Sequence, residues 1–274
     1  MKKIVFIDVD GTLVNEKMAA PESAQAACRT AVKNGHTLCL CSGRQRFLME
    51  DLMGLGFQAV ISAGGAEIEI ERDVVFQRLF DDSLTRKITG FFMERETPFT
   101  LERSTGLVGS PFLFSWFDWL KAKEPHFAQY IDMYVKYEHV IRAEEGVFYG
   151  NAGKIVFGSI QPGFFDAVVA EFGGECDITR TSMAALYGNE GGEMTMKGLN
   201  KGSAVARVLE HYGLSKTDAI GIGDSDNDRA MLDACGIGVA MGNSKDDFKK
   251  IADFVTSDIN DDGIEKAFKQ YGLI

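Results

Sequence analysis

The 274-residue sequence predicts an α/β protein whose core is a doubly wound parallel sheet, interrupted by an inserted second α/β domain. Apolar strands and amphipathic helices alternate over the first eighty residues, and the same alternation resumes near residue 199. The segment between them has strands in which apolar and polar residues alternate, which is typical of a sheet with one wetted face. We therefore expect a core of residues 1–81 and 193–274 and an inserted domain of residues 82–192.

The spacing of apolar residues predicts the amino-terminal part of the core. Pro21 stands at the start of a helix and Gly35 beyond its end, and between them Ala24, Ala27 and Cys28 recur at the spacing of a buried helical face. Gly56 ends a second helix in the same way. The predicted elements are strand 3–7, helix 21–34, strand 37–41, helix 45–55 and strand 59–62.

The carboxy-terminal part of the core follows the same pattern. Ala204, Val205, Val208 and Leu209 lie on one face of a predicted helix, and short apolar strands follow it. The predicted elements are helix 201–212, strand 219–222, helix 227–235, strand 237–241, strand 254–256 and a last helix.

The inserted domain is predicted to contain strands at Lys154–Ile160 and Met183–Tyr187. Five aromatic residues crowd its first half and suggest either a platform for a ligand or an ordinary core. We expect the core, because aromatic side chains in a small domain usually supply its buried interior. These residues are Phe112, Phe114, Trp116, Phe117 and Trp119.

Composition excludes several classes of protein. The net charge of −11, without a cluster of Lys and Arg, argues against a nucleic-acid partner. No run of eighteen apolar residues predicts a membrane span, and the chain passes from Lys2-Lys3 directly into a strand, unlike a signal peptide. We therefore expect a cytoplasmic protein with no membrane partner. The cysteines are odd in number and scattered, which predicts reduced core residues: Cys28, Cys39, Cys41, Cys176 and Cys235.

Two acids, Asp8 and Asp10, directly follow the apolar run of the first strand. Buried carboxylates this close repel one another unless a cation or a reacting centre balances them. Asp and Gly also form ordinary turns, so a strand-to-turn junction is the simpler alternative. A calcium loop of the EF-hand type is excluded, because no glutamate follows at the required spacing.

A second group of acids, Asp224, Asp226 and Asp228, follows the strand at 219–222. Ser42 follows the strand at 37–41, and Lys201 opens the helix at 201–212. In open parallel sheets, ligands gather beyond the carboxyl ends of the strands. We therefore expect these sequence-distant motifs to converge.

The order Asp-x-Asp, Ser-Gly, Lys and Gly-Asp-x-x-Asn-Asp resembles the four motifs of the haloacid dehalogenase superfamily of phosphotransferases. The resemblance covers nearly the whole chain and is strongest to the Cof-type branch, which implies a Rossmann-like core with an α/β cap between the second and third motifs. Further signatures of that branch are similar to Met241-Gly242-Asn243 and to residues 260–263. The sequence departs from the family in Ser42, where threonine is usual, and in Gly64-Gly65-Ala66, where Asn-Gly-Ala is usual.

The chemistry of phosphate-ester cleavage suggests a role for each acid. Asp8, fixed at a strand end, can attack phosphorus and form an aspartyl-phosphate, and Asp10 can serve as acid and base. The resemblance implies the same two assignments. Hard oxygen ligands indicate Mg²⁺, held by Asp8, Asp224 and, as the family implies, the Asp10 carbonyl. Asp228 is expected to hold the metal through water or to support its ligands. Asp226 and Asp233 are expected to face solvent.

Lys201 is expected to neutralise the phosphoryl oxygens together with Asp8, and Lys197 competes for that role. We favour Lys201, because Lys-Gly at a helix start matches the family and a helix amino terminus favours anions. Phosphate contacts are expected from Ser42 and the Gly43 amide.

Three further phosphate or substrate contacts are suggested by the family pattern, each with an alternative. Arg44 contacts the substrate or is a solvated surface residue. Asn227 either orients an aspartate and the phosphate of the substrate or is only a helix-start residue. Asn243 reaches toward the active site.

These assignments predict a Mg²⁺-dependent phosphatase acting on a small-molecule phosphate ester through phospho-Asp8. The resemblance implies sugar phosphates and similar metabolites as substrates, with the cap lining the pocket. A phosphomutase on the same scaffold is one alternative, and a non-catalytic metal-binding module is another. The sequence does not predict the oligomeric state.

Overall fold

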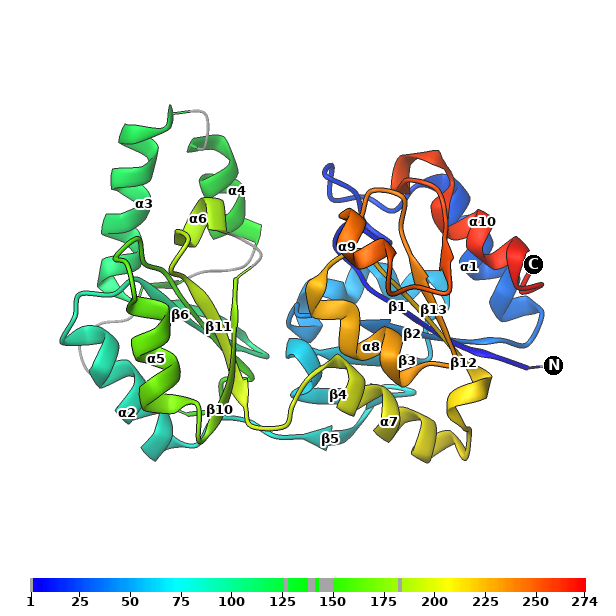
Figure 1. The fold of residues 1–274 in the computed structure, drawn as a ribbon, viewed down its shortest axis with the longest axis horizontal. Helices are drawn as coiled ribbons and strands as arrows, with labels where there is room; N and C mark the ends of the chain where they lie inside the picture. The colour runs from blue at the N-terminus through cyan, green and yellow to red at the C-terminus, as the bar shows by residue number, and fades with distance from the viewer. Residues whose placement is uncertain (1, 126–127, 138–140, 143–149, 182–183) are drawn as a thin grey trace. The chain divides into compact units, whose positions relative to one another are not determined.

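The computed structural model describes residues 2–125, 128–137, 141–142, 150–181 and 184–274. They form two compact units, one of Met1–Gln77 and Asn200–Ile274 and the other of Arg78–Leu199. We call the first the core and the second the cap. Figure 1 shows the helices and strands of each unit.

The core contains one eight-stranded sheet in the order β14-β13-β12-β1-β2-β3-β4-β5. The strands from β14 to β3 pair in parallel, and β4 and β5 add an antiparallel edge that the sequence pattern did not predict. The strands are β1 (Ile4–Ile7), β2 (Thr37–Cys41), β3 (Ala59–Ser62), β4 (Glu67–Ile70), β5 (Asp73–Gln77), β12 (Ala219–Gly223), β13 (Ile237–Ala240) and β14 (Phe254–Val255). The expected α/β fold with a mainly parallel sheet is confirmed.

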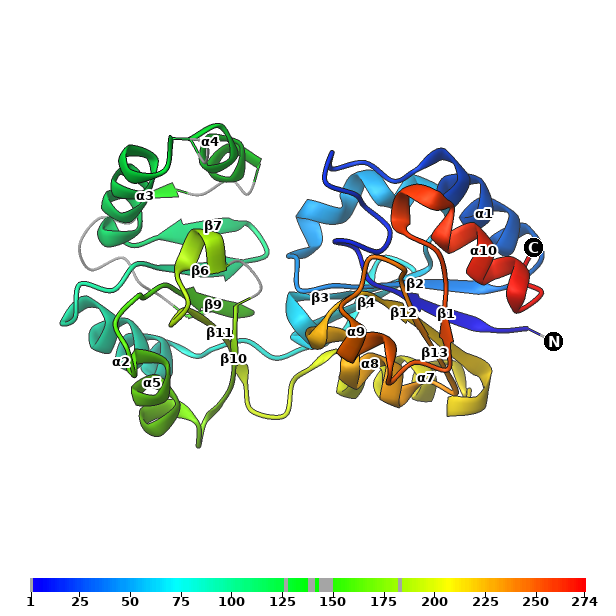
Figure 2. The same ribbon diagram turned by 45° about the horizontal axis from the view of Figure 1, so that its top comes forward.

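Helices cover both faces of the core sheet, as Figure 2 shows with the strands between two helical layers. The α-helices are α1 (Glu22–Lys33), α7 (Lys201–Tyr212), α8 (Arg229–Ala234), α9 (Asp246–Lys249) and α10 (Gly263–Gln270). The 3-10 helices are η1 (Arg46–Leu55), η2 (Ala63–Gly65), η4 (Lys216–Asp218), η5 (Asp226–Asp228) and η6 (Ile259–Asp261). The helix expected at 45–55 is thus a 3-10 helix, and the one expected at 227–235 begins with a 3-10 turn.

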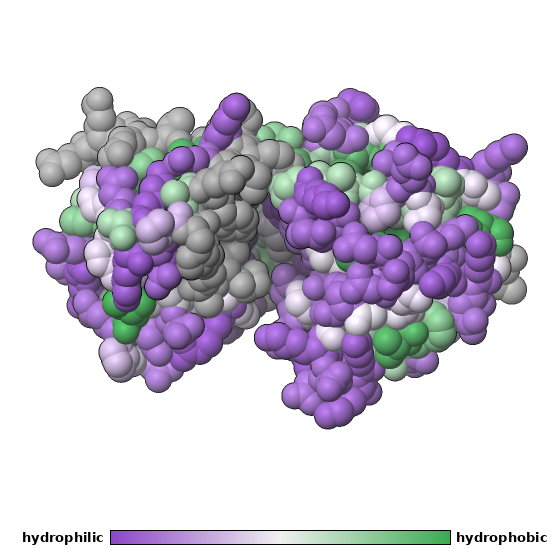
Figure 3. Space-filling model, turned by 90° about the horizontal axis from the view of Figure 1, so that it is seen from above, coloured by the Kyte–Doolittle hydropathy of each residue, from purple (hydrophilic) through white to green (hydrophobic). Residues whose placement is uncertain are grey.

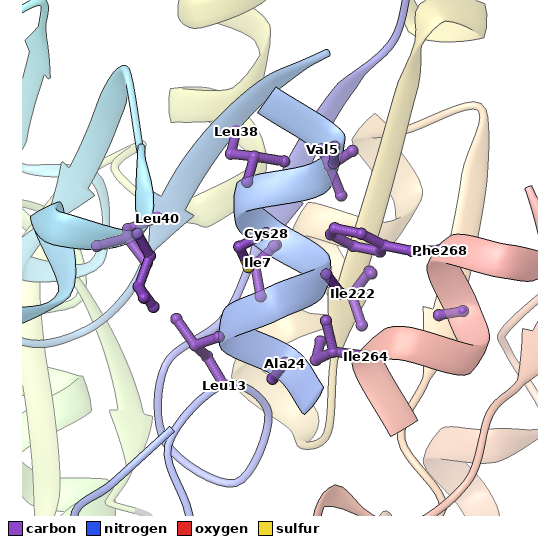
Figure 4. Packing of buried hydrophobic residues seen from close by; sticks show 14 of the residues in the cluster. Val5, Ile7, Leu13, Ala24, Cys28, Leu38, Leu40, Ile222, Ile264 and Phe268 are labelled. Carbon is purple, nitrogen blue, oxygen red and sulfur yellow. The ribbon is translucent and has the colours of Figure 1, made fainter. Parts of the chain in front are cut away.

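Alternation along β1 explains why two apolar layers form. Val5 and Ile7 point to the face covered by α1 and α10, whereas Ile4 and Phe6 point to the face covered by α7 and α8. In Figure 4, Cys28 of α1 and Phe268 of α10 lie over β1 and its neighbours. Since both faces of β1 are buried, this strand is continuously apolar until Asp8, the first polar residue beyond its carboxyl end.

The cap contains a six-stranded sheet in the order β10-β11-β9-β6-β7-β8. Helices α2 and α5 pack on one face, where Phe92, Phe99, Phe157 and Phe172 are fully buried. Its elements are α2 (Asp82–Met93), β6 (Phe99–Arg103), β7 (Gly106–Gly109), α3 (Pro111–Lys123), α4 (Ala128–Tyr137), β8 (Ile141–Arg142), β9 (Lys154–Phe157), α5 (Phe164–Phe172), β10 (Cys176–Arg180), α6 (Ala184–Tyr187) and β11 (Gly192–Met196).

The prediction of a strand at 183–187 is wrong for the part of that segment that the structure describes. Met183 lies outside the described residues, and Ala184–Tyr187 is the short helix α6. A run of four apolar residues suits a buried strand and a buried helical turn equally, so its surroundings decide. Here the Leu186 carbonyl accepts a hydrogen bond from the indole of Trp116, and the Tyr187 carbonyl accepts one from the Ser159 amide.

The aromatic residues of α3 divide between the interior and the surface. Phe114 and Phe117 are buried, as expected for a core. Phe112 and Trp116 are partly buried, and Trp119 is exposed, so the expectation of a buried cluster is wrong for Trp119. Trp119 packs instead against Trp116 and the ammonium of Lys123.

The predicted burial of all five cysteines is confirmed, and each is a free thiol. Burial raises the pKa of Cys28 and of Cys235 to about 12, so these thiols are protonated at neutral pH. Among the described residues, no helix combines the length and apolar character needed to cross a membrane. The described surface of the core in Figure 3 is mostly hydrophilic.

Candidate active site

The parallel pairing of β1 with β12 brings the two acidic motifs together. Ile7 lies opposite Ile222 in the register, and the Asp8 amide donates to the Ile222 carbonyl at 3.0 Å. Asp8 therefore continues the strand ladder at the carboxyl end of β1, beside the loop that carries Asp224. This edge of the sheet is where the sequence predicted a site.

Three carboxylates gather at this edge. Asp8, Asp224 and Asp228 each offer an oxygen atom, and these atoms all lie within 4.8 Å of one another. Asp8 and Asp228 are buried, and Asp224 is partly exposed. We call these three residues the acid cluster. Like charges at such distances require compensation.

Lys201 supplies the positive charge within the acid cluster. Its Nζ lies 2.5 Å from Asp8 Oδ1 and 2.5 Å from Asp228 Oδ1, and its side chain is buried. Asn200 caps α7 by accepting a hydrogen bond from the Ser203 amide, so Lys201 is the first residue of the helix. Burial by itself would lower the pKa of Lys201, but the charges of Asp228 and Asp8 raise it, and the ammonium stays charged.

One lysine does not balance three acids. Burial and the charge of Asp228 raise the pKa of Asp8 well above its usual range, although Lys201 opposes this effect. Burial and Asp228 also raise the pKa of Asp224 to about 6. The cluster therefore holds more negative charge than its surroundings stabilise, and its donors are the hard carboxylate oxygens that divalent cations prefer. The residues fit a divalent metal ion.

Asp228 uses both carboxylate oxygens within the protein. Oδ1 binds Lys201, and Oδ2 accepts hydrogen bonds from the amides of Asp224 and Ser225 at 3.1 and 3.2 Å. Asp228 thus orients both the lysine and the loop of Asp224. This arrangement favours the supporting role that the sequence suggested over direct metal binding.

Glycines allow the close approach of the acids. Gly11 has a φ of +80°, and a Cβ there would lie 2.6 Å from Asp224 Oδ2. A Cβ at Gly223 would lie 2.6 Å from the Asp228 carboxyl carbon. Thr12 adds a hydrogen bond from its hydroxyl to Asp224 Oδ1 at 3.2 Å. Sequence reasoning missed Thr12, although a hydroxyl beside the Asp-Gly turn was a visible signal.

Gly11→Ala tests this close approach. We expect a loss of roughly 1–2 kcal/mol from the positive φ, together with weaker metal binding because Asp224 must move. Gly35→Ala is the matched control, since Gly35 has a φ of +90° and a Cβ there would meet no other group within 4 Å. Urea unfolding and Mg²⁺ titration of both variants measure the two effects. Equal metal affinity in both would contradict the role of Gly11.

Ser42, Gly43 and Arg44 follow β2. Ser42 is buried, its hydroxyl accepts a hydrogen bond from the Arg44 amide at 3.1 Å, and its carbonyl accepts one from Gly64. The Arg44 guanidinium binds the Asp10 carboxylate through both oxygens, at 2.9 and 2.5 Å. The alternative of a solvated surface role for Arg44 is therefore wrong.

The remaining predicted residues lie around this centre. Asn227 is exposed on η5 and accepts a hydrogen bond from the Ser225 hydroxyl. Asn243 donates to the Gly11 carbonyl at 2.8 Å and accepts from the Ile259 amide, so it supports the loop after Asp10. Asp226 and Asp233 are exposed, as expected. Lys197 belongs to the cap, where it pairs with Asp177 at 3.0 Å.

The family model of the haloacid dehalogenase-like hydrolases matches residues 5–268. Among curated proteins, Phosphatase YwpJ of Bacillus subtilis is 27% identical over 97% of this chain and 99% of its own length. The 5-amino-6-(5-phospho-D-ribitylamino)uracil phosphatase YcsE of the same organism is 28% identical over 99% of this chain and 96% of its own length.

Solved structures support the fold. The subclass IIB sugar phosphatase BT4131 superposes with a TM-score of 0.81 at 23% identity, covering 100% of both chains. BT1666 from Bacteroides thetaiotaomicron superposes with a TM-score of 0.79 at 21% identity, covering 100% of this chain and 96% of its own. Since the family model spans nearly the whole sequence, the chain belongs to the haloacid dehalogenase-like hydrolases and is an enzyme of the phosphatase type that its four motifs predicted.

Proposed function

We propose that this hydrolase is a Mg²⁺-dependent phosphatase that cleaves small phosphorylated metabolites through an aspartyl-phosphate on Asp8. The observation that supports this most is the placement of Asp8. Its carboxylate lies at a strand end, binds the ammonium of Lys201 through Oδ1, and lies within 4.8 Å of the other two members of the acid cluster. Such a carboxylate is held in place and accompanied by the charges that a phosphoryl group requires.

The metal would be held by Asp8, Asp224 and the Asp10 carbonyl, with Asp228 orienting its neighbours. When bound, Mg²⁺ supplies positive charge that stabilises the phosphoryl oxygens. Ser42 and the Gly43 amide lie at the end of the neighbouring strand β2 and are proposed to donate hydrogen bonds to the same oxygens. Lys201 contributes the second cationic charge.

The reaction then proceeds in two steps. An Asp8 oxygen attacks phosphorus, and the bond from phosphorus to the leaving oxygen breaks. The leaving oxygen keeps the electron pair of that bond and accepts a proton from Asp10. In the second step a water molecule attacks the phosphoryl group, and Asp10 accepts a proton from that water. The bond from phosphorus to Asp8 then breaks, and its electron pair returns to the Asp8 carboxylate. Inorganic phosphate and the regenerated Asp8 carboxylate are the products.

The substrates proposed are sugar phosphates and related metabolites. The names of YcsE and BT4131 support this class, since they describe a phosphorylated ribityl compound and sugars as the substrates of those proteins. We propose that the cap selects among them. A cytoplasmic location and the absence of nucleic-acid partners stay predictions from the sequence.

A panel of phosphorylated metabolites, with p-nitrophenyl phosphate as a general probe, tests this function. We expect Mg²⁺-dependent release of inorganic phosphate that stops when a chelator is added. Transfer of the phosphoryl group to a second position of a sugar, with no free phosphate, would instead establish a phosphomutase. No turnover of any ester with Mg²⁺ would favour the non-catalytic alternative.

Metal binding is expected to stabilise the fold in a pH-dependent way. The pKa of Asp224 is raised to about 6, so the metal-free fold binds a proton more tightly than the unfolded chain does. Proton binding to Asp224 therefore stabilises the metal-free fold fully below the usual carboxyl pKa, and this stabilisation is lost as the pH rises through about 6. At low pH the metal must displace that proton, whereas at higher pH it binds a free carboxylate. We therefore expect Mg²⁺ to raise the melting temperature more at pH 7.5 than at pH 5.

Melting curves with Mg²⁺ and with chelator at the two pH values measure this effect. A Mg²⁺ concentration of 100 times Kd would raise the free energy of unfolding by about 2.7 kcal/mol. Asp224→Asn should reduce the shift, whereas Asp233→Asn, which removes an exposed acid of α8, should leave it unchanged. An equal shift for both variants would contradict the assignment of Asp224.

A further inference from the structure

We propose that Arg44 is a positioning residue that fixes the Asp10 carboxylate for proton transfer to the leaving group, and that it does not bind the phosphoryl group itself. This inference rests on the proposed function, because it concerns a step of that reaction. It replaces the direct phosphate contact that the sequence suggested for Arg44.

The first observation is the geometry of the pair. Arg44 Nε donates to Asp10 Oδ2 at 2.9 Å, and Nη2 donates to Oδ1 at 2.5 Å. Two parallel hydrogen bonds from the planar guanidinium fix the plane of the carboxylate as well as its distance. The edge of the guanidinium formed by Nε and Nη2 is therefore already occupied by Asp10.

The second observation is that Arg44 is the anchored partner. Its side chain is 9% exposed, whereas that of Asp10 is 59% exposed. The Arg44 amide donates to the Ser42 hydroxyl, and the Arg44 carbonyl accepts from the Ala63 amide at 2.8 Å. A further bond from Nη1 to the Leu48 carbonyl, at 3.4 Å, holds the guanidinium. The carboxylate thus reaches outward while the arginine that aims it is held by the core.

The difference in exposure between Arg44 and Asp10 affects proton transfer to the leaving group. An exposed carboxyl group on a short side chain has several rotamers, and only some would meet a leaving oxygen within hydrogen-bond distance. A guanidinium fixed at the end of β2 selects one of them. Orientation of this kind lowers the barrier for proton transfer without any contact between Arg44 and the substrate.

Two aryl phosphates separate this role from phosphate binding. Phenyl phosphate releases a poor leaving group that needs the proton of Asp10, whereas 2,4-dinitrophenyl phosphate releases a good one that does not. The value of kcat/KM covers only the steps up to departure of the leaving group, so later hydrolysis of phospho-Asp8 does not affect it. Arg44→Met should lower kcat/KM for phenyl phosphate by about 10- to 100-fold, and for the dinitrophenyl ester by less than about threefold.

Arg46→Met is the matched control. Arg46 lies two residues further along, its side chain is 13% exposed, and it binds Glu69 through the same two nitrogens at 2.9 and 3.2 Å. Its loss removes this fork and the ion pair of Nη1 with Glu50 at 2.8 Å, neither of which involves Asp10. We expect similar changes in stability for the two variants, and no dependence on the leaving group for Arg46→Met.

Two further variants test the mechanism of positioning. Arg44→Lys keeps the charge but loses the fork, so it should resemble Arg44→Met, whereas a phosphate-binding charge would be largely restored. Asp10→Asn should show the same dependence on the leaving group. Adding Arg44→Met to Asp10→Asn should then cost little more, because the two residues act as one unit.

The outcomes are distinct. An equal loss for both esters in Arg44→Met, or recovery in Arg44→Lys, would overturn the inference and assign Arg44 to the phosphoryl group. An increase in activity would also overturn it, since the pair would then restrain Asp10 unproductively. If the unmodified enzyme cleaves neither ester nor any metabolite, the proposed function itself fails. Circular dichroism of each variant confirms that it is folded.

Discussion

Asp8→Asn is expected to abolish phosphate release, lowering kcat/KM by at least about 10³-fold, which corresponds to about 4 kcal/mol in the barrier. The amide has nearly the same shape as the carboxylate, but its neutral oxygen does not attack phosphorus to form a stable acyl phosphate. Release of phosphate from p-nitrophenyl phosphate with saturating Mg²⁺ measures the loss. Activity within tenfold of the unmodified enzyme would remove Asp8 from its role as nucleophile.

The structure indicates that the Asp8→Asn variant will fold. Lys201 keeps its ion pair with Asp228, and the backbone bond from residue 8 to Ile222 does not depend on the side chain. The change also removes a crowded carboxylate whose pKa is raised by burial and by the charge of Asp228. Asp226→Asn is a suitable control, because Asp226 is exposed and pairs with Arg229 outside the acid cluster. It should retain activity.

Lys201→Met is expected to have the second largest effect, on both activity and stability. The change leaves Asp8 and Asp228 buried without the ammonium that both bind at 2.5 Å. Removing one partner of a buried ion pair costs about 3–5 kcal/mol, because the remaining charge is left uncompensated. We expect such a loss in urea unfolding at pH 7.5 without metal, and a smaller loss with Mg²⁺. Activity should fall by about 10³-fold, since the phosphoryl oxygens lose a fixed positive charge.

Lys197→Met is the matched control for Lys201→Met. Both residues are lysines paired with aspartate, but the Lys197 side chain is 54% exposed in the cap. Exposed pairs contribute only about 0.2–1 kcal/mol, so we expect a small change in stability and unchanged cleavage of p-nitrophenyl phosphate. The comparison also decides which of the two lysines, Lys197 or Lys201, neutralises the phosphoryl oxygens. Equal effects of the two substitutions would contradict the placement of Lys201 in the site.

Local patterns predicted most of the core because its elements are encoded locally. The start of α1 after Pro21, its end before Gly35 and its buried face from Ala24 to Ala31 each depend on residues in or next to one helix. Residues 183–187 show where this reasoning fails. That run is too short for periodicity to distinguish a helix from a strand, and contacts with Trp116 and Ser159 come from distant parts of the chain.

The residues of the candidate site show the same contrast between local sequence patterns and contacts with distant parts of the chain. The sequence by itself determined which residues are the candidates for the proposed chemistry: acids directly after two apolar strands, a serine after a third, and a lysine at a helix start. Only the tertiary structure decided that Lys201 bridges Asp8 to Asp228, and that Arg44 binds Asp10. The physical reason is that strand ends and caps follow from neighbouring residues, whereas the pairing of side chains depends on sheet register and rotamers, which the whole packed core selects.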